Sequence, residues 1–368
     1  MEARVPPAGG NGPAPTTAVA AVARRADGVS PRCPRESCKG TGPTSSAPSC
    51  GRQPERTGPG TPHHREGATL SPAPPHDAYS RGNPTLRFLE EFGWGDLVSL
   101  GRLTPLTLPW LVGGRLDALQ RRLARDSLAL LRHRRGQRVL DACCGRGYAA
   151  AALAGSGCTA VGLDVLPAQI SQARQRFGQG ARLGFAVADV RAPPARVEGI
   201  DLGDASFDRI HCLEAAFHFG PPGRSAFLME GFRLLRPGGR LVLVDITWRG
   251  EDPHRIDRVD PARLVRDTWQ FDEFEPRTRY PRLARRAGFT VHKVLDWSNT
   301  VTRPWGQAAA LLGRIAATPL GRAALRARRP GLGDLTLEEW RHLADVARAH
   351  HAVASSVSYT ALVLDKPV

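Results

Sequence analysis

Three aspartates and a short glycine turn are the residues whose types and spacing best fit a ligand-binding site. Asp141 ends a short apolar run and precedes the glycine turn at 145–147. Asp164 ends a second apolar run 23 residues later, and Asp189 ends a third. A strand, a glycine turn and a helix start form the nucleotide-binding edge of a doubly wound α/β sheet. We therefore expect the three carboxylates to lie along one such edge.

Two classes of ligand use a turn of this kind. Gly145 and Gly147, followed by Ala150, fit the dinucleotide fingerprint, and they equally fit a site for S-adenosylmethionine. Asp141 separates the two classes, because a carboxylate repels the pyrophosphate that a helix N-terminus attracts. The sulfonium and ammonium groups of S-adenosylmethionine are cationic and suit an aspartate. Asp164 suits a ribose in both classes. The simpler alternative, in which each aspartate only caps the next helix, fits three evenly spaced acids poorly.

The segments around these residues resemble the class I S-adenosylmethionine-dependent methyltransferases. The matching segments are 140–147, 162–165, 188–190, 207–210 and 235–241, and the resemblance covers about residues 115–298 and the last strand. Segment 213–219 is most similar to bacterial methyltransferases that modify polyketides, macrolides and glycosylated natural products. The resemblance implies an α/β fold with a doubly wound, seven-stranded, mostly parallel Rossmann-like sheet. It also implies S-adenosylmethionine as cofactor, a small-molecule acceptor, and no metal.

Nine residues are predicted to contact the cofactor on these grounds. The aspartates and the glycine turn come from the pattern itself, and the backbone groups beside them come from the resemblance. The residues are Asp141, Cys143, Gly145, Gly147, Asp164, Val165, Asp189, Val190 and Leu213.

Two residues are predicted to be catalytic. His218 lies five residues past the expected fourth strand, and an imidazole titrates near neutrality, which suits a general base for a hydroxyl acceptor. Relatives that form O-methyl products carry a histidine at or beside this place, but Phe217 stands where some carry a second one. Asp245 ends the expected fifth strand and is predicted to orient His218 or to hold the acceptor. The alternatives are a packed histidine and a loop-capping aspartate. Glu214 is expected near the methionine end of the cofactor, and His254 is a weaker base candidate.

From residue 138 the sequence alternates apolar runs with helical patterns, as in a parallel sheet covered on both faces. The expected strands are 138–142, 159–164, 183–188, 207–213, 240–246, 289–296 and 357–364, with the last inserted antiparallel beside the fifth as in the family. Helices are expected at 115–132, 167–177, 224–235, 306–316 and 336–352. Segments 247–276 and 298–354 exceed what the sheet needs, so we interpret them as a cap over the acceptor, or as structural or oligomer-contact insertions.

The N-terminal residues differ from the rest. Residues 1–80 contain 24 Gly or Pro and few large apolar side chains, which predicts a disordered tail before a domain at 81–368. They lack the apolar segment of a secretory signal; a transit peptide or a misassigned start are the alternatives. Cys33, Cys38 and Cys50 with His63 and His64 are spaced too loosely for a metal site. Residues 81–114 are predicted to fold over the cofactor and acceptor, or to pack on the sheet edge.

Composition bears on partners and location. The chain has 51 Lys and Arg against 35 Asp and Glu, for a net charge of +16, but only three of the cations are lysine. This arginine bias is typical of GC-rich coding and gives little support to nucleic-acid binding. No apolar run has the length of a membrane span. We expect a cytoplasmic protein with reduced cysteines, and a homodimer is left open.

The leading hypothesis is O-methylation of a small natural product. C- or N-methylation of a small molecule or a lipid competes with it. A nicotinamide-dependent oxidoreductase would use Gly145, Gly147 and Asp164 but leaves Asp141 and Asp189 without a role. A binding module that kept the cofactor fold is the third class.

Overall fold

The computed structural model describes residues 75, 77–80, 82–95, 97–104 and 115–368. All of them belong to the second of two compact units, which spans Glu66–Val368. Most of the predicted tail, its cysteines and His63 and His64 lie outside the described residues.

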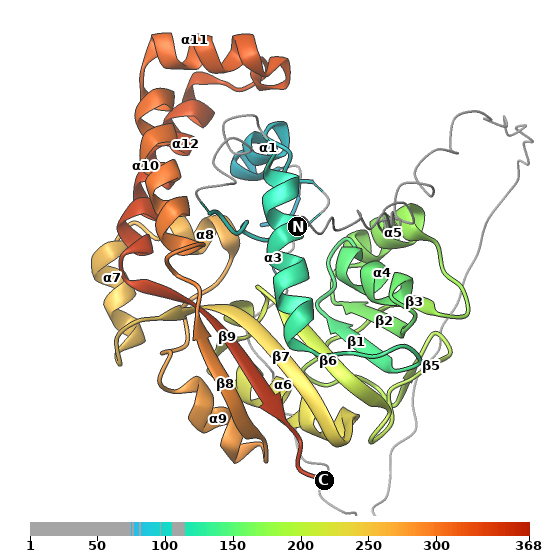
Figure 1. Cartoon of the computed structure of the whole chain (residues 1–368). Coiled ribbons are helices and arrows are strands. Elements are labelled where there is room, and N and C mark those ends of the chain that lie inside the picture. The colour runs from blue at the N-terminus through green and yellow to red at the C-terminus, as the bar shows by residue number, and fades with distance from the viewer. Residues whose placement is uncertain (1–74, 76, 81, 96, 105–114) are drawn as a thin grey trace, which may run out of the picture. The chain divides into compact units, whose positions relative to one another are not determined.

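A seven-stranded sheet carries the site (Figure 1). Its order is β3-β2-β1-β6-β7-β9-β8, and β9 runs antiparallel to both of its neighbours. The predicted α/β class, the strand number and the inserted last strand are thereby confirmed. The strands are β1 Arg138–Ala142, β2 Thr159–Asp164, β3 Leu183–Val187, β6 Phe207–Leu213, β7 Leu235–Trp248, β8 Thr290–Asp296 and β9 Val357–Asp365. Two strands of two residues each, β4 Arg196–Val197 and β5 Ile200–Asp201, pair in a separate small sheet that the sequence analysis did not predict.

Strand β7 is longer than predicted at both ends. It pairs with β9 continuously from Arg240 opposite Asp365 to Trp248 opposite Val357. Asp245 therefore lies inside the strand, opposite Thr360, and does not end it as expected.

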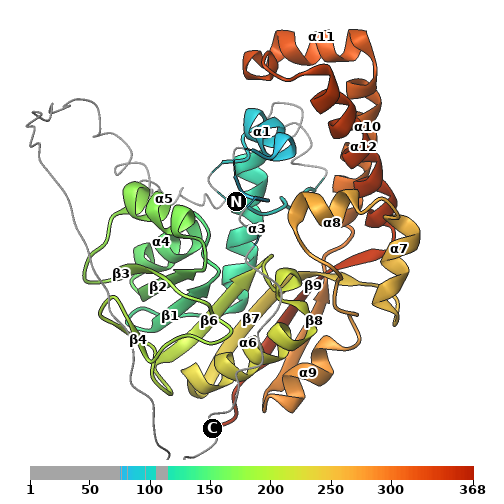
Figure 2. The same cartoon turned by 180° about the vertical axis from the view of Figure 1, so that it is seen from behind.

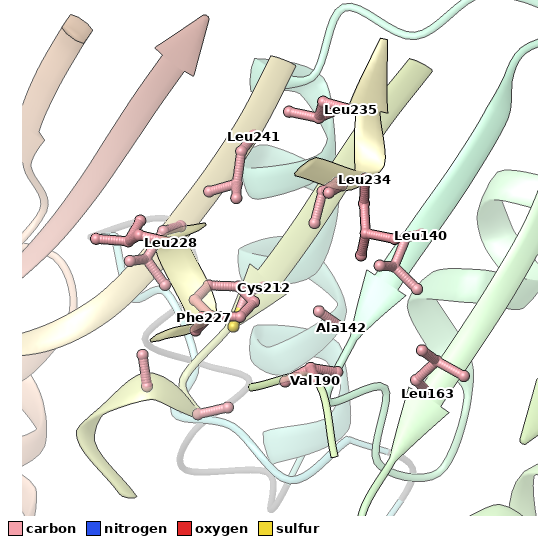
Figure 3. Packing of buried hydrophobic residues seen from close by; sticks show 14 of the residues in the cluster. Leu140, Ala142, Leu163, Val190, Cys212, Phe227, Leu228, Leu234, Leu235 and Leu241 are labelled. Atoms are coloured by element: carbon pink, nitrogen blue, oxygen red, sulfur yellow. The ribbon is translucent and has the colours of Figure 1, made fainter. Parts of the chain in front are cut away.

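Helices cover both faces of the sheet, as the alternating pattern predicted. They are α1 Pro84–Glu91, α3 Leu116–Leu130, α4 Tyr148–Gly155, α5 Pro167–Phe177, α6 Gly220–Leu234, α7 Ile256–Val259, α8 Leu264–Trp269, α9 Tyr280–Arg286, α10 Thr302–Ala317, α11 Pro319–Arg328 and α12 Leu337–Ala354. Because side chains alternate along a strand, Val139 packs toward α3, α4 and α5, whereas Leu140 packs toward α6 and α9. Figure 2 shows α6 and α9 on the face of the sheet opposite α3. Figure 3 shows the buried apolar side chains beneath α6, among them Leu140, Phe227 and Leu228.

The two long insertions are helical. Segment 247–276 contains α7 and α8, and segment 298–354 contains α10, α11 and α12. Helices α10 and α12 lie side by side, with α11 at their far end (Figure 1). Thr336 and Glu339 form a capping box at the start of α12, which satisfies two of its free backbone donors. Phe88 of α1 packs edge-on against Trp340 of α12, so the N-terminal segment and the cap share one apolar cluster.

No helix among the described residues is long and apolar enough to cross a membrane.

Candidate active site

The glycine turn after β1 has two glycines with different tasks. Gly145 has a φ of +51° and lines a cavity of about 120 Å³ at the carboxyl ends of β1, β2 and β6. Gly147 has a φ of +83°, and a Cβ atom there would lie 2.8 Å from Ala173 and from the ring of Phe185. Gly147 thus allows α4 to pack closely on the sheet, and it does not line the cavity.

Six of the nine predicted cofactor residues line this first cavity, which we call the cofactor cavity. The six are Asp141, Cys143, Gly145, Asp164, Val165 and Leu213. Gly147, Asp189 and Val190 do not line it.

Asp141 is buried, and both of its carboxylate oxygens have hydrogen-bond partners within the protein. Its Oδ2 accepts a hydrogen bond from the Ala150 amide at 3.0 Å, and its Oδ1 lies 2.8 Å from Nδ1 of His211. The other ring nitrogen of His211 lies 2.9 Å from the hydroxyl of Ser127 on α3. Asp141 therefore ties the start of α4 and strand β6 to β1, in addition to forming part of the cavity wall.

Asp164 shapes the turn from the next strand. Its Oδ2 accepts from the Gly145 amide and its Oδ1 from the Leu166 amide, both at 2.9 Å. Burial raises the pKa of this carboxyl, and the two amide donors oppose that rise. The carboxylate is thus fixed at the cavity wall.

Asp189 is bound by its own neighbour. Both of its oxygens accept from the Arg191 guanidinium, at 2.8–3.0 Å. The Val190 side chain is buried in the core beneath α6. An adenine contact from these two residues stays a prediction, and for Val190 it concerns the backbone amide alone.

Two polar side chains that the sequence analysis missed complete the cofactor cavity. Ser99 and Gln169 are almost fully buried and line it, and neither Ser99 Oγ nor Gln169 Oε1 has a partner in the described part of the chain. Unpartnered buried oxygens are costly unless a ligand satisfies them, so the cavity fits a ligand rich in hydroxyl and amino groups. Gln169 could have been found from the sequence, because it lies in the first turn of the helix that follows Asp164. No local sequence feature indicated Ser99.

His218 lies in the turn Ala216–Phe219 and lines the cofactor cavity. Its Nε2 lies 2.9 Å from the Tyr79 hydroxyl, and its Nδ1 lies 3.4 Å from the Gln270 carbonyl oxygen. A carbonyl only accepts, so the ring proton belongs on Nδ1, and Tyr79 donates to Nε2. Burial lowers the pKa of His218 to about 4, which the Gln270 carbonyl opposes. The imidazole is neutral at physiological pH.

Asp245 does not orient His218, which corrects our expectation. Its Oδ2 accepts from the Tyr280 hydroxyl at 2.7 Å, its Oδ1 has no partner among the described residues, and it lines neither cavity described here. Burial raises the pKa of Asp245 to about 7 against the opposing effects of Tyr280 and Arg224. A direct catalytic role stays a prediction that this geometry does not favour.

Glu214 occupies the position between the two cavities. It follows β6 with a φ of +51°, an uncommon conformation for a residue with a side chain. Its carboxyl accepts from the Leu100 amide at 2.8 Å and from the Tyr359 hydroxyl. Burial raises the pKa of Glu214 to about 7, which these two donors oppose.

A second cavity of about 180 Å³ lies beneath the cap, and we call it the acceptor cavity. Its wall is mostly apolar and comes from α1, α8, α10 and α12, with Trp94, Trp269 and Trp305 among its side chains. The two cavities share three residues, Tyr79, Val98 and Glu214. Described residues of segments 81–114, 247–276 and 298–354 line this cavity. That these segments cover a bound acceptor stays a prediction.

Comparison with known proteins points to one family. Residues 139–239 match the model of a methyltransferase domain. The methyltransferase GfsG of Streptomyces halstedii is 33% identical over 204 residues, which cover 54% of this chain and 69% of GfsG. The O-methyltransferase resE of Aspergillus sclerotiorum is 28% identical over 189 residues, which cover 50% of this chain and 67% of resE.

Solved structures share the fold. The [4+2]-cyclase SpnF superposes with a TM-score of 0.57 at 20% identity, covering 81% of this chain and 98% of SpnF. A geranyl diphosphate methyltransferase in complex with GPP and sinefungin superposes with a TM-score of 0.54 at 17% identity. The match covers 77% of this chain and 93% of that methyltransferase. These likenesses establish the fold alone, and the sequence relatives establish the family. This chain is a methyltransferase by family and belongs to the class I S-adenosylmethionine-dependent methyltransferases.

Proposed function

We propose that this enzyme transfers a methyl group from S-adenosylmethionine to a hydroxyl of a small, largely apolar natural product. One observation carries the proposal: a polar cavity at the glycine turn meets an apolar cavity under the cap, and Tyr79, Val98 and Glu214 line both. A cofactor in the first would lie beside an acceptor in the second. Alignment of two bound reactants supplies much of the rate of such a displacement.

The cofactor supplies an electrophilic methyl group on a sulfonium when bound. Asp164 would hold its ribose hydroxyls, and the unpartnered oxygens of Ser99 and Gln169 would accept from its remaining donors. The Leu213 carbonyl would accept from its amino group, as the family resemblance implies. Asp141 and Glu214 contribute the negative charge that suits a cationic ligand.

His218 would remove the proton of the acceptor hydroxyl through Tyr79. The Tyr79 hydroxyl donates to Nε2 of His218, so its oxygen is free to accept from a hydroxyl in the acceptor cavity. The proton then passes to Tyr79 as the Tyr79 proton passes to Nε2. The hydroxyl becomes strongly acidic as its oxygen gains the methyl group, so a base with a pKa of about 4 still accepts the proton downhill.

Glu214 is the second candidate base, because it lines both cavities and has a pKa near 7. A carboxylate there also suits an acceptor carbon or nitrogen that must lose a proton, so C- and N-methylation remain the alternatives. The names of the relatives support the hydroxyl: resE is an O-methyltransferase, as is the erythromycin 3''-O-methyltransferase of Saccharopolyspora erythraea, at 28% identity over 39% of this chain. SpnF, a cyclase with this fold, shows that the fold alone does not identify the reaction.

The first test is calorimetric titration of the full chain with S-adenosylhomocysteine and, separately, with NADH. We expect the first alone to bind. Binding of NADH alone would move the assignment to the oxidoreductase alternative. Candidate hydroxylated acceptors are then screened by mass spectrometry for a product heavier by one methylene unit. The absence of nucleic-acid partners, the cytoplasmic location and a homodimer stay predictions.

A further inference from the structure

Two buried polar atoms in the wall of the acceptor cavity have no hydrogen-bond partner among the described residues. Its polar wall residues are Tyr79, Thr85, Trp94, Glu214, Trp269, Thr302, Trp305 and His350. In the part of the chain that the structure describes, all but two of these have a hydrogen-bond partner. The exceptions are Thr85 Oγ1 and Trp94 Nε1, in side chains that are 8% and 4% exposed.

The three indoles of this wall make the contrast clear. Trp269 donates its N–H to Nε2 of His350 at 2.8 Å, and Trp305 donates to the Gly101 carbonyl at 3.0 Å. Trp94 stacks on Trp269, with ring centroids 6.2 Å apart, and meets Trp305 edge-on at 5.8 Å. Its ring is thus held by two neighbours, while its N–H has no acceptor among the residues that the structure describes. A buried donor without an acceptor is destabilising, and a bound ligand that supplies an acceptor removes that cost.

The chemistry of the two atoms specifies the group they bind. An indole N–H only donates, whereas a threonine hydroxyl donates and accepts. A carbonyl, ether or hydroxyl oxygen suits either atom. Neither Thr85 nor Trp94 lines the cofactor cavity, so this oxygen is distinct from the one that would be methylated near Tyr79 and Glu214.

The volume of the cavity limits what surrounds that oxygen. About 150 Å³ accommodates a benzene ring, and this cavity measures about 180 Å³. The apolar wall therefore suits a ring with a short extension, or the branched apolar end of a larger molecule.

We propose that the acceptor cavity selects an apolar substrate that carries a second oxygen, which Trp94 and Thr85 hold by hydrogen bonds. The inference deepens the proposed function and rests on it, since it assigns a specificity contact to the same acceptor site. Thr85 and Trp94 are specificity residues in this reading, and the proton chemistry remains with Tyr79, His218 and Glu214.

The test uses two probes of nearly equal shape, 1-indanone and indane, which differ by one carbonyl oxygen. Their dissociation constants are measured by ligand-observed NMR with the full chain saturated with S-adenosylhomocysteine. The ratio of the indane constant to the indanone constant is compared among the wild type, Trp94→Phe, Thr85→Val and Trp305→Phe. Thr85→Val keeps the side-chain shape, and Trp305→Phe removes an N–H that already has an acceptor.

We expect the ratio to fall about five- to tenfold in Trp94→Phe and in Thr85→Val, the equivalent of one hydrogen bond, and to stay unchanged in Trp305→Phe. If Trp94→Phe does not fold, Thr85→Val decides alone. An unchanged ratio in Thr85→Val, an equal fall in Trp305→Phe, or no binding of either probe to the wild type would overturn the inference. Failure of the proposed function is separate, because it would appear as no binding of S-adenosylhomocysteine.

Discussion

The substitution Asp164→Asn should weaken cofactor binding strongly, because both oxygens of Asp164 accept hydrogen bonds. Each accepts one backbone amide at 2.9 Å, from Gly145 and from Leu166. In Asp164→Asn one oxygen becomes an amino group that faces an N–H donor. The ribose hydroxyls that Asp164 is proposed to hold would also lose a hydrogen bond to a charged group, worth about 1.5–3 kcal/mol, which corresponds to about a 10- to 150-fold rise in the dissociation constant of S-adenosylhomocysteine. The assay is isothermal titration of the folded variant.

Asp201→Asn is the matched control. Its Oδ1 likewise accepts a backbone amide, from Gly203 at 3.0 Å, but it lies outside the cofactor cavity, so we expect the dissociation constant to change by less than about threefold, within the usual effect of a surface polar substitution. Gln169→Leu provides a second perturbation that leaves the glycine turn intact, and about tenfold weaker binding is expected from the loss of its unpartnered oxygen. Equal losses of affinity in Asp164→Asn and Asp201→Asn, or an unchanged constant in Asp164→Asn, would refute this account of the site.

Three further predictions concern pH and packing. With His218 as base, kcat at saturating acceptor should stay within about twofold from pH 8 to pH 6, because its pKa is about 4; a loss of about tenfold per pH unit below 7 would instead identify Glu214. Asp245→Asn should raise the melting temperature more at pH 8 than at pH 5. The folded-state pKa of Asp245 is raised to about 7, so the fold favours the protonated carboxyl and loses stability as pH rises from about 4 through 7; an equal effect at both pH values would contradict this. Gly147→Ala should lower the free energy of unfolding in urea by about 2–4 kcal/mol, from steric overlap plus left-handed strain. Gly136→Ala, with a φ of +82° and open space around its Cβ, should show the strain alone, and an equal loss in both would rule out the overlap.

The strands of the sheet could be predicted because each contains an apolar run that is visible in the local sequence. Apolar runs that end in an acid or in a turn located β1, β2, β3 and β6 to within a residue at each end. Strand ends that depend on pairing with a strand distant in sequence were harder to predict. Asp245 was placed at the end of a strand because nothing near it shows that β9, more than a hundred residues later, extends the pairing to Trp248. Strands β4 and β5 are two residues long and leave no periodic signal.

The site divides in the same way. The glycine turn and Asp164 are neighbours through one βα unit, so a local pattern was enough to find them. Tyr79 meets His218 across 139 residues of sequence, and Ser99 reaches the cofactor cavity from the N-terminal segment. These contacts depend on how that segment packs on the sheet and cap, which no short motif records. Gln169 lay within the reach of sequence reasoning and was overlooked.

The N-terminal segment has a thermodynamic consequence, because one stretch of chain forms walls of two compartments. Tyr79 and Val98 line both cavities, Ser99 lines only the cofactor cavity, and Thr85 and Trp94 line only the acceptor cavity. We expect the first ligand to restrain this stretch, so that the second loses less conformational entropy on binding. The two affinities are therefore linked, and reciprocity requires each ligand to tighten the other by the same factor. An enzyme built in this way retains its methyl donor most firmly when there is something to methylate.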